Sequence, residues 1–426
     1  MQEAEQIVRQ ALADVRVIDP HCHLRPEKPG AGHLDDIVLY HHVWIELVSS
    51  GMPQFEVTQA GLPHELASPG LPPFERVRRA LPYLHNIANT TVGVCLRRLL
   101  NDLYDVPDLN EGTLERAYAV VEERASDPRW QSSFLPERCG IERNITVEAG
   151  NPTTQVLTGT KRVLESIADG KRSSWEVLEG MEQAFGREIR NADDYRESLR
   201  MVVEGLPVDR LSFVNVWPTA YLNGEGVTEE AVTRILRDVR EGRVLKHDDV
   251  GRFGYFGLAA ILHLLMATPV RTVQLIAGAQ VLPPHRAITE WGETFTRALA
   301  ELAGVYGDFH FSLSTASDAF TQDLGILAKH LPNVSLAGYW WHTLYPFYIR
   351  KSLETRLDMV PLNKIVGFFS DAYHAEWCYP KLVLVKEIVG DILVERIARG
   401  WYSTDLALEI VRALFYDNPA RIYGVA

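Results

Sequence analysis

The chain has 426 residues, of which 46% are hydrophobic and 23% are charged, so its composition is that of a globular protein and disfavours wholesale disorder. Its 43 lysines and arginines against 56 acidic residues give a formal charge of −13, and no basic run offsets it, which argues against nucleic acid as a partner. The four cysteines are widely spaced, and neither a signal peptide nor a bilayer-spanning segment is recognisable. We therefore expect a cytoplasmic protein that does not associate with membranes.

The first part of the chain predicts a helix over residues 2–14 and a short strand over 15–18, which runs into D-P-H-C-H at 19–23. From about residue 34 to 130, apolar residues recur at helical spacing. We therefore expect three parts. Residues 1–33 would hold the N-terminal helix and the first strand, residues 34–135 would form a helical insertion, and residues 136–426 would complete the main domain.

Short β-type runs alternate with helical stretches beyond residue 140. Together with 15–18 they make eight predicted strands, the others being 144–149, 155–159, 211–217, 272–279, 309–314, 334–340 and 365–370. Helical patterns lie between most of them, at 229–240, 293–305, 322–330 and 346–358. This alternation indicates parallel strands, and eight such units favour an α/β fold of the (β/α)8 TIM-like barrel type over an open sheet. No glycine-rich phosphate-binding motif follows any strand.

His21 and His23 stand at the carboxyl end of the first predicted strand. Residues two apart in a strand point to the same face, and active sites of barrels form at this end of the strands. Two imidazoles on one face are good ligands for a divalent metal ion such as Zn²⁺. The alternative interpretation is a pair of unrelated loop histidines.

Asp371 follows the last predicted strand. A carboxylate at the mouth of a barrel can ligate a metal ion and act as an acid or base, although an aspartate there can also cap the next helix. The first and eighth strands are neighbours in a closed barrel. His21, His23 and Asp371 could therefore converge on one metal ion.

This pattern resembles the amidohydrolase superfamily, and within it the uronate isomerase (glucuronate isomerase) family. The family motif H-Y-x-x-x-E is matched by H-H-V-W-I-E at 41–46, and its G-x-W-W motif is matched by G-Y-W-W at 338–341. The segment T/S-D-S/A-R is matched by S-D-A-Y at 370–373, and the closing N-x-x-R by N-P-A-R at 418–421. The resemblance covers residues 15–50 and 270–426 and is weak through 51–210.

The resemblance implies a metal-dependent isomerase that interconverts an aldose hexuronate and its ketose form, of the glucuronate/fructuronate or galacturonate/tagaturonate type. Proton transfer from C2 to C1 would pass through an enediolate. The resemblance assigns one Zn²⁺ ion to His21, His23 and Asp371, and the proton transfers to Asp371, His41 or His42. It also implies a small sugar acid as substrate and a homo-oligomer.

The sequence departs from the family pattern at two positions. His42 stands where the family has a tyrosine, and Tyr373 stands where it has an arginine that helps to hold the sugar carboxylate. A phenol cannot reproduce a bidentate guanidinium contact. We expect the remaining substrate contacts among two aromatic residues and a set of cationic or histidine side chains: Trp340, Trp341, Lys161, Arg162, Arg286, His285 and, less directly, His342 and His374.

Two other activities are compatible with the same residues. A metal held by this triad can activate water, with Asp371 as the base, to hydrolyse a lactone, an amide or an ester. The altered carboxylate clamp at Tyr373 favours this alternative. A catalytically silent binding protein is a third interpretation, and the retention of all three expected ligands argues against it.

Overall fold

Eight strands that pair only in parallel form the centre of the fold in the computed structural model, which describes residues 2–53, 71–147, 154–156, 179, 182–183, 185–282 and 286–425. All eight predicted strands are present. They are β1 (Val17–Cys22), β2 (Ile141–Thr146), β3 (Thr154–Val156), β4 (Phe213–Val216), β5 (Thr272–Ala277), β8 (His310–Thr315), β9 (Val334–Ala337) and β10 (Ile365–Val366).

The strands form two hydrogen-bonded ladders that meet at the expected metal-binding residues. One ladder has the order β10-β9-β8-β5-β4-β3, and the other pairs β1 with β2. The segment after β10 joins them, because the amide of His23 donates to the carbonyl of Ala372 at 2.8 Å and the amide of Asp371 donates to the carbonyl of His21 at 3.0 Å. The described residues therefore show every neighbouring pair of an eight-stranded ring except β2–β3. The closed barrel stays a prediction.

The strands are buried on both faces, as parallel strands covered by helices must be. In β5, Val273 and Leu275 belong to the large apolar cluster shared with the helices. Ile276, on the opposite face, belongs to a separate inner cluster that also holds Phe213, Val366 and Phe369. Gln274 shares the inner face with Ile276, since the two residues are two positions apart.

Helices cover the strands and build a separate group around the end of β1. α1 (Gln2–Asp14) and α12 (Glu229–Arg240) have the bounds predicted from the sequence. The other helices of the strand–helix alternation are α11 (Ala192–Glu204), α13 (His247–Leu265), α14 (Phe295–Val305), α15 (Thr321–His330), α16 (Pro346–Met359), α17 (Ala375–Ala398), α18 (Thr404–Arg412) and α19 (Asn418–Tyr423). No helix in the described part of the chain is both long and apolar enough to cross a membrane.

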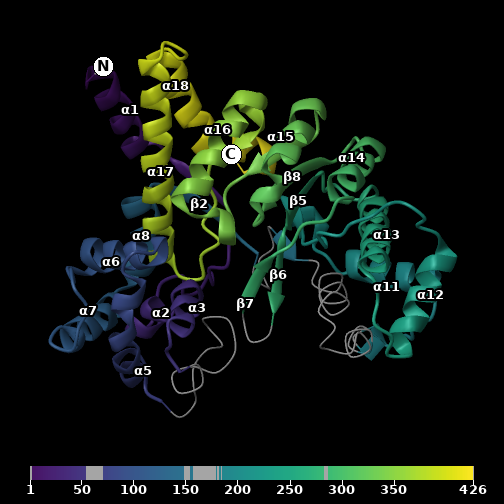
Figure 1. Cartoon of the computed structure of the whole chain (residues 1–426), viewed down its shortest axis with the longest axis horizontal. Helices are drawn as coiled ribbons and strands as arrows, with labels where there is room; N and C mark the ends of the chain where they lie inside the picture. The colour runs from purple at the N-terminus through teal and green to yellow at the C-terminus, as the bar shows by residue number, and fades with distance from the viewer. Residues whose placement is uncertain are drawn as a thin grey trace.

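The stretch between β1 and β2 is helical, as expected, and contains no strand within residues 34–53 and 71–134. Its α-helices are α2 (Leu34–Val38), α3 (His41–Ser49), α5 (Pro73–Ala80), α6 (Thr91–Tyr104), α7 (Leu114–Ser126) and α8 (Pro128–Phe134). In Figure 1 these helices gather below the long helix α17, on the other side of the molecule from α11, α12 and α13.

Several strands end at other residues than predicted. The first strand, expected over 15–18, continues to Cys22, and three later strands end early. The strand expected over 272–279 ends at Ala277 because Gly278 adopts a positive φ of 89°, after which β6 (Ala279–Leu282) and β7 (Arg286–Thr289) form an unpredicted antiparallel hairpin. Gly338, with φ of 50°, ends β9 early in the same way. β10 pairs over two residues only, since the amide of Gly367 donates to the carbonyl of Leu414.

Candidate metal centre

His21, His23 and Asp371 meet where β1 ends beside the segment that follows β10. Asp371 Oδ1 lies 3.4 Å from His21 Nε2 and 3.3 Å from His23 Nε2. One potential ligand atom from each residue lies within 4.8 Å of the others. His21 is 0% and Asp371 3% exposed, and His21 Nε2 and Asp371 Oδ1 make no hydrogen bond within the described residues. Buried polar atoms of this kind need a partner.

The chemistry of these three residues fits a divalent metal ion. Two imidazole nitrogens and one carboxylate oxygen form a donor set typical of catalytic zinc sites, which leave a further position for water or substrate. Burial opposes ionisation of Asp371, but the adjacent His21 and His23 imidazoles outweigh it, and the pKa of Asp371 lies well below its usual range. The carboxylate is therefore in the charged form that a metal ion requires.

The backbone at Asp371 is unusual. Its φ is 48°, in the left-handed region that residues with a side chain rarely adopt. Trp341 is the other non-glycine residue near the site with a positive φ, at 46°. Such conformations persist where the surrounding structure imposes them, and they cluster at active sites. Asp19 helps to fix the backbone just before Asp371, since its Oδ1 accepts a hydrogen bond of 2.9 Å from the amide of Ser370.

Gln274 orients His21, although no sequence motif pointed to this residue. His21 Nδ1 lies 2.7 Å from Gln274 Oε1, which also accepts a 2.7 Å hydrogen bond from Asn215 Nδ2. An amide oxygen only accepts, so His21 Nδ1 must carry the proton and Nε2 presents its lone pair toward Asp371. Gln274 Nε2 donates to the Tyr423 hydroxyl at 3.1 Å, which fixes the amide orientation.

We expect Gln274→Leu to lower metal affinity about 10–100-fold, because partners that orient a metal-bound histidine typically have effects of this size. Competition with a chromogenic chelator measures this affinity. Ser312→Ala is the matched control, because Ser312 Oγ contacts the Tyr423 hydroxyl at 2.7 Å at the far side of the same network. Equal metal affinity in wild type and Gln274→Leu would show that Gln274 does not orient His21.

His41 and His42 begin α3 and form an aromatic cluster with Trp341 and Tyr373. The ring centroids of His41 and Tyr373 are 5.2 Å apart, and those of His42 and Trp341 are 5.1 Å apart. Burial lowers the pKa of His41 well below its usual value and lowers the pKa of His42 to about 3. Both imidazoles are therefore neutral in this structure, and their burial opposes protonation.

Tyr373, which takes the place of the family arginine, faces the expected metal site. Its ring stacks on His23 with a centroid distance of 4.3 Å and an interplanar angle of 4°. Trp341 is half-buried beside His41 and His42, whereas Trp340 is 1% exposed and packs against Trp217 in the inner cluster.

The structure locates only some of the expected substrate-binding cations and histidines. His342 follows Trp341, and their rings contact each other at 5.9 Å. His374 Nε2 lies 4.0 Å from Asp36 Oδ1. Lys161, Arg162 and His285 lie outside the described residues, and of Arg286 only the backbone, in β7, is described.

A buried lysine that the sequence analysis did not select lies behind Asp371. Lys381 of α17 is 4% exposed, and its Nζ donates to the carbonyl of Ser370 at 2.8 Å. It also lines a cavity of about 20 Å³ together with His42 and Trp341, which is space for about one water molecule. The available sequence signal was a lone charge within the apolar run 377–385 of a long helix.

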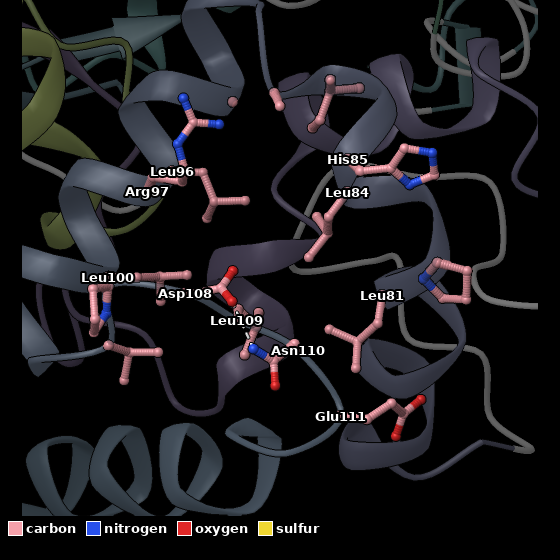
Figure 2. A pocket seen from close by; sticks show the side chains of 16 residues that line it. Leu81, Leu84, His85, Leu96, Arg97, Leu100, Asp108, Leu109, Asn110 and Glu111 are labelled. Atoms are coloured by element: carbon pink, nitrogen blue, oxygen red, sulfur yellow. Dashed lines mark hydrogen bonds between the residues drawn. The ribbon is translucent and has the colours of Figure 1, made fainter.

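A larger cavity of about 460 Å³ lies among the helices of residues 81–111 and does not touch the candidate metal centre. Figure 2 shows its wall, where leucines such as Leu81 and Leu84 alternate with the polar side chains of His85, Arg97 and Glu111. The polar side chains of Asp108 and Asn110 are hydrogen-bonded to each other at 2.6 Å. Among the described residues, a group of potential metal ligands is formed by His21, His23 and Asp371, and we therefore take the candidate site to lie there.

Three solved structures share the fold of this chain over almost its whole length. A uronate isomerase from Thermotoga maritima matches with a TM-score of 0.78 and 14% identity, covering 99% of this chain and 97% of that one. A glucuronate isomerase from Caulobacter crescentus matches with a TM-score of 0.78 and 17% identity, covering 99% of this chain and 94% of that one. A uronate isomerase from Bacillus halodurans matches with a TM-score of 0.71 and 16% identity, covering 99% of this chain and 96% of that one. No protein-family model and no curated protein sequence matches the chain. The motif-based resemblance is thus confirmed at the level of the α/β fold.

Proposed function

We propose that this protein is a metal-dependent aldose–ketose isomerase that acts on a hexuronate. The observation that carries the proposal is the convergence of His21, His23 and Asp371 at the end of β1, in a fold shared with uronate isomerases. The proposal includes a closed (β/α)8 barrel with residues 34–135 as an insertion. It also includes a cytoplasmic homo-oligomer as the working form.

His21, His23 and Asp371 would hold the divalent ion, and Zn²⁺ suits their donor atoms. When bound, such an ion acts as a Lewis acid that polarises oxygen atoms of the substrate. Gln274 keeps the lone pair of His21 Nε2 directed at the site through its contact with Nδ1. His21 and Asp371 are buried, which keeps bulk water away from these two ligands and strengthens charge interactions there.

The chain supplies groups for moving a proton from C2 to C1. Asp371 is a carboxylate, and His41 and His42 are neutral imidazoles, so all three are in the unprotonated form that a general base needs. The pKa of each lies below its usual value, so a proton taken up there would be held weakly and released again to C1. Removing the C2 proton produces an enediolate, whose negative charge needs nearby positive charge or hydrogen-bond donors. Trp341 and Tyr373 offer aromatic faces for the apolar side of a sugar ring. For the substrate carboxylate, the proposed cation is Lys161, Arg162 or Arg286.

A substrate panel tests this function. We expect the metal-loaded protein to convert glucuronate or galacturonate into a keto-sugar of unchanged mass, as measured by mass spectrometry with a colorimetric ketose assay. The panel should include lactones, amides and esters, whose hydrolysis gives products one water heavier. Turnover of one of those compounds with no uronate converted would replace the isomerase by a hydrolase that uses Asp371 as its base.

A further inference from the structure

Lys381 is a buried positive charge without a carboxylate partner of its own. Within the described residues its Nζ has three oxygen contacts, and none of these is a side-chain carboxylate. They are the carbonyl of Ser370 at 2.8 Å, the hydroxyl of Tyr40 at 3.2 Å and the carbonyl of Asp371 at 3.4 Å. Burying an ammonium group is costly unless it is well hydrogen-bonded. A lysine in this place therefore needs an explanation beyond packing.

The contacts of Lys381 converge on one short segment of backbone. Tyr40, which precedes α3, donates its hydroxyl to the carbonyl of Asp371 at 3.2 Å. The carbonyls of Ser370 and Asp371 are thus bound by one ammonium group and one phenol that contact each other. Tyr40 also stacks on Trp377, one turn before Lys381 in α17, with ring centroids 4.5 Å apart. The two donors are therefore held in place by packing.

This segment is also where the backbone has its unusual conformation. Asp371 has φ of 48°, and the direction of its side chain depends on that angle. With an ordinary negative φ, the carboxylate would leave the chain in another direction and move away from His21 and His23. An unfavourable backbone angle persists only where surrounding contacts impose it. Lys381 and Tyr40 supply such contacts on one side, and the bond from the Asp371 amide to the His21 carbonyl supplies one on the other.

We propose that Lys381 is a positioning residue for the metal centre: together with Tyr40 it holds the carbonyls of Ser370 and Asp371, and so directs the Asp371 carboxylate toward His21 and His23. This inference deepens the proposed function and rests on its metal centre, but not on the identity of the substrate. It also adds positive charge close to a site that would take an anionic sugar.

Lys381→Met tests the proposal, since methionine keeps much of the length of the side chain and removes the ammonium group. We expect the affinity for Zn²⁺ to fall about 10–100-fold, as for other residues that orient metal ligands. The visible absorption spectrum of the Co²⁺-loaded protein should also change, because the carboxylate ligand shifts. Tyr40→Phe, which removes one hydroxyl, should lower the affinity less and in the same direction.

Lys364→Met is the matched control. Lys364 is also buried, with 7% exposure, and its Nζ donates to two backbone carbonyls, those of Ala328 and Leu331, near the start of β10. Its loss should lower the unfolding temperature of the metal-free protein much as the loss of Lys381 does. It should leave Zn²⁺ affinity and the Co²⁺ spectrum unchanged, because it does not touch the segment around Asp371.

Wild-type Zn²⁺ affinity and an unchanged Co²⁺ spectrum in Lys381→Met would overturn the proposal. If Lys381→Met fails to fold, the Zn²⁺ affinity and the Co²⁺ spectrum of Tyr40→Phe test the proposal in its place. A wild-type protein that converts no uronate would contradict the proposed function alone. In that case, loss of metal affinity in Lys381→Met would still support the positioning role.

Discussion

Replacing His21 by alanine should abolish stoichiometric binding of Zn²⁺. His21 is completely buried, and its Nε2 is one of three donor atoms that lie within 4.8 Å of one another. Two remaining ligands do not make a zinc site, which needs at least three from the protein. The variant should also lose about 1–3 kcal/mol of unfolding free energy, since Gln274 loses a hydrogen-bond partner. Metal analysis of the purified, dialysed protein measures the stoichiometry.

His310→Ala is the control for this prediction. His310 begins β8 and contacts Ser335 Oγ at 2.8 Å, so its removal also deletes a histidine hydrogen bond within the strands. His310 lies at the amino end of the parallel strands, whereas the candidate metal centre lies at their carboxyl end. This variant should retain one Zn²⁺ per chain. One Zn²⁺ per chain in His21→Ala would show that the protein holds the ion at another site.

Asp371→Asn should lower kcat about 10²–10⁴-fold on the uronate that the wild-type protein converts, because it removes both a charged ligand and a general base. The amide has nearly the same shape, and asparagine tolerates a positive φ well, so the fold should persist. Steady-state kinetics measures the loss, and circular dichroism checks the fold.

Asp35→Asn provides a matched comparison for that substitution. Asp35 is also a buried aspartate, with 6% exposure, but it pairs with Arg76 at 2.5 Å between α2 and α5. Its amide variant should be less stable than wild type yet keep kcat. A kcat near the wild-type value in Asp371→Asn would remove Asp371 from the proposed chemistry.

The convergence of His21, His23 and Asp371 was predictable from one local rule and one rule of the expected fold. Side chains alternate along a strand, which places His21 and His23 on one face. The first and last strands of a barrel lie next to each other, which brings Asp371 to these two histidines. Helix bounds such as those of α12 followed from an apolar stripe that begins after Thr228, whose side chain caps the helix. The strand alternation and the helix cap are each contained in a few consecutive residues, whereas the position of Asp371 beside His21 followed from the expected barrel.

The supporting residues were not predictable in this way. Gln274 and Lys381 look like isolated polar residues in apolar segments, and only the tertiary structure shows that one contacts His21 and the other Asp371. The left-handed conformation of Asp371 has no sequence signal, because the residue is not a glycine. The hairpin of β6 and β7 was missed because a single glycine, Gly278, ends the strand that precedes it.

Removing and restoring the metal ion while following uronate conversion tests the central claim most directly. The protein should be treated with a chelator, dialysed, and reloaded with increasing Zn²⁺ in the presence of glucuronate or galacturonate. We predict that keto-sugar formation disappears on removal and returns in proportion to bound metal, with saturation at one ion per chain. Undiminished conversion by the metal-free protein, or no keto-sugar from the fully loaded protein with any hexuronate, would contradict the account.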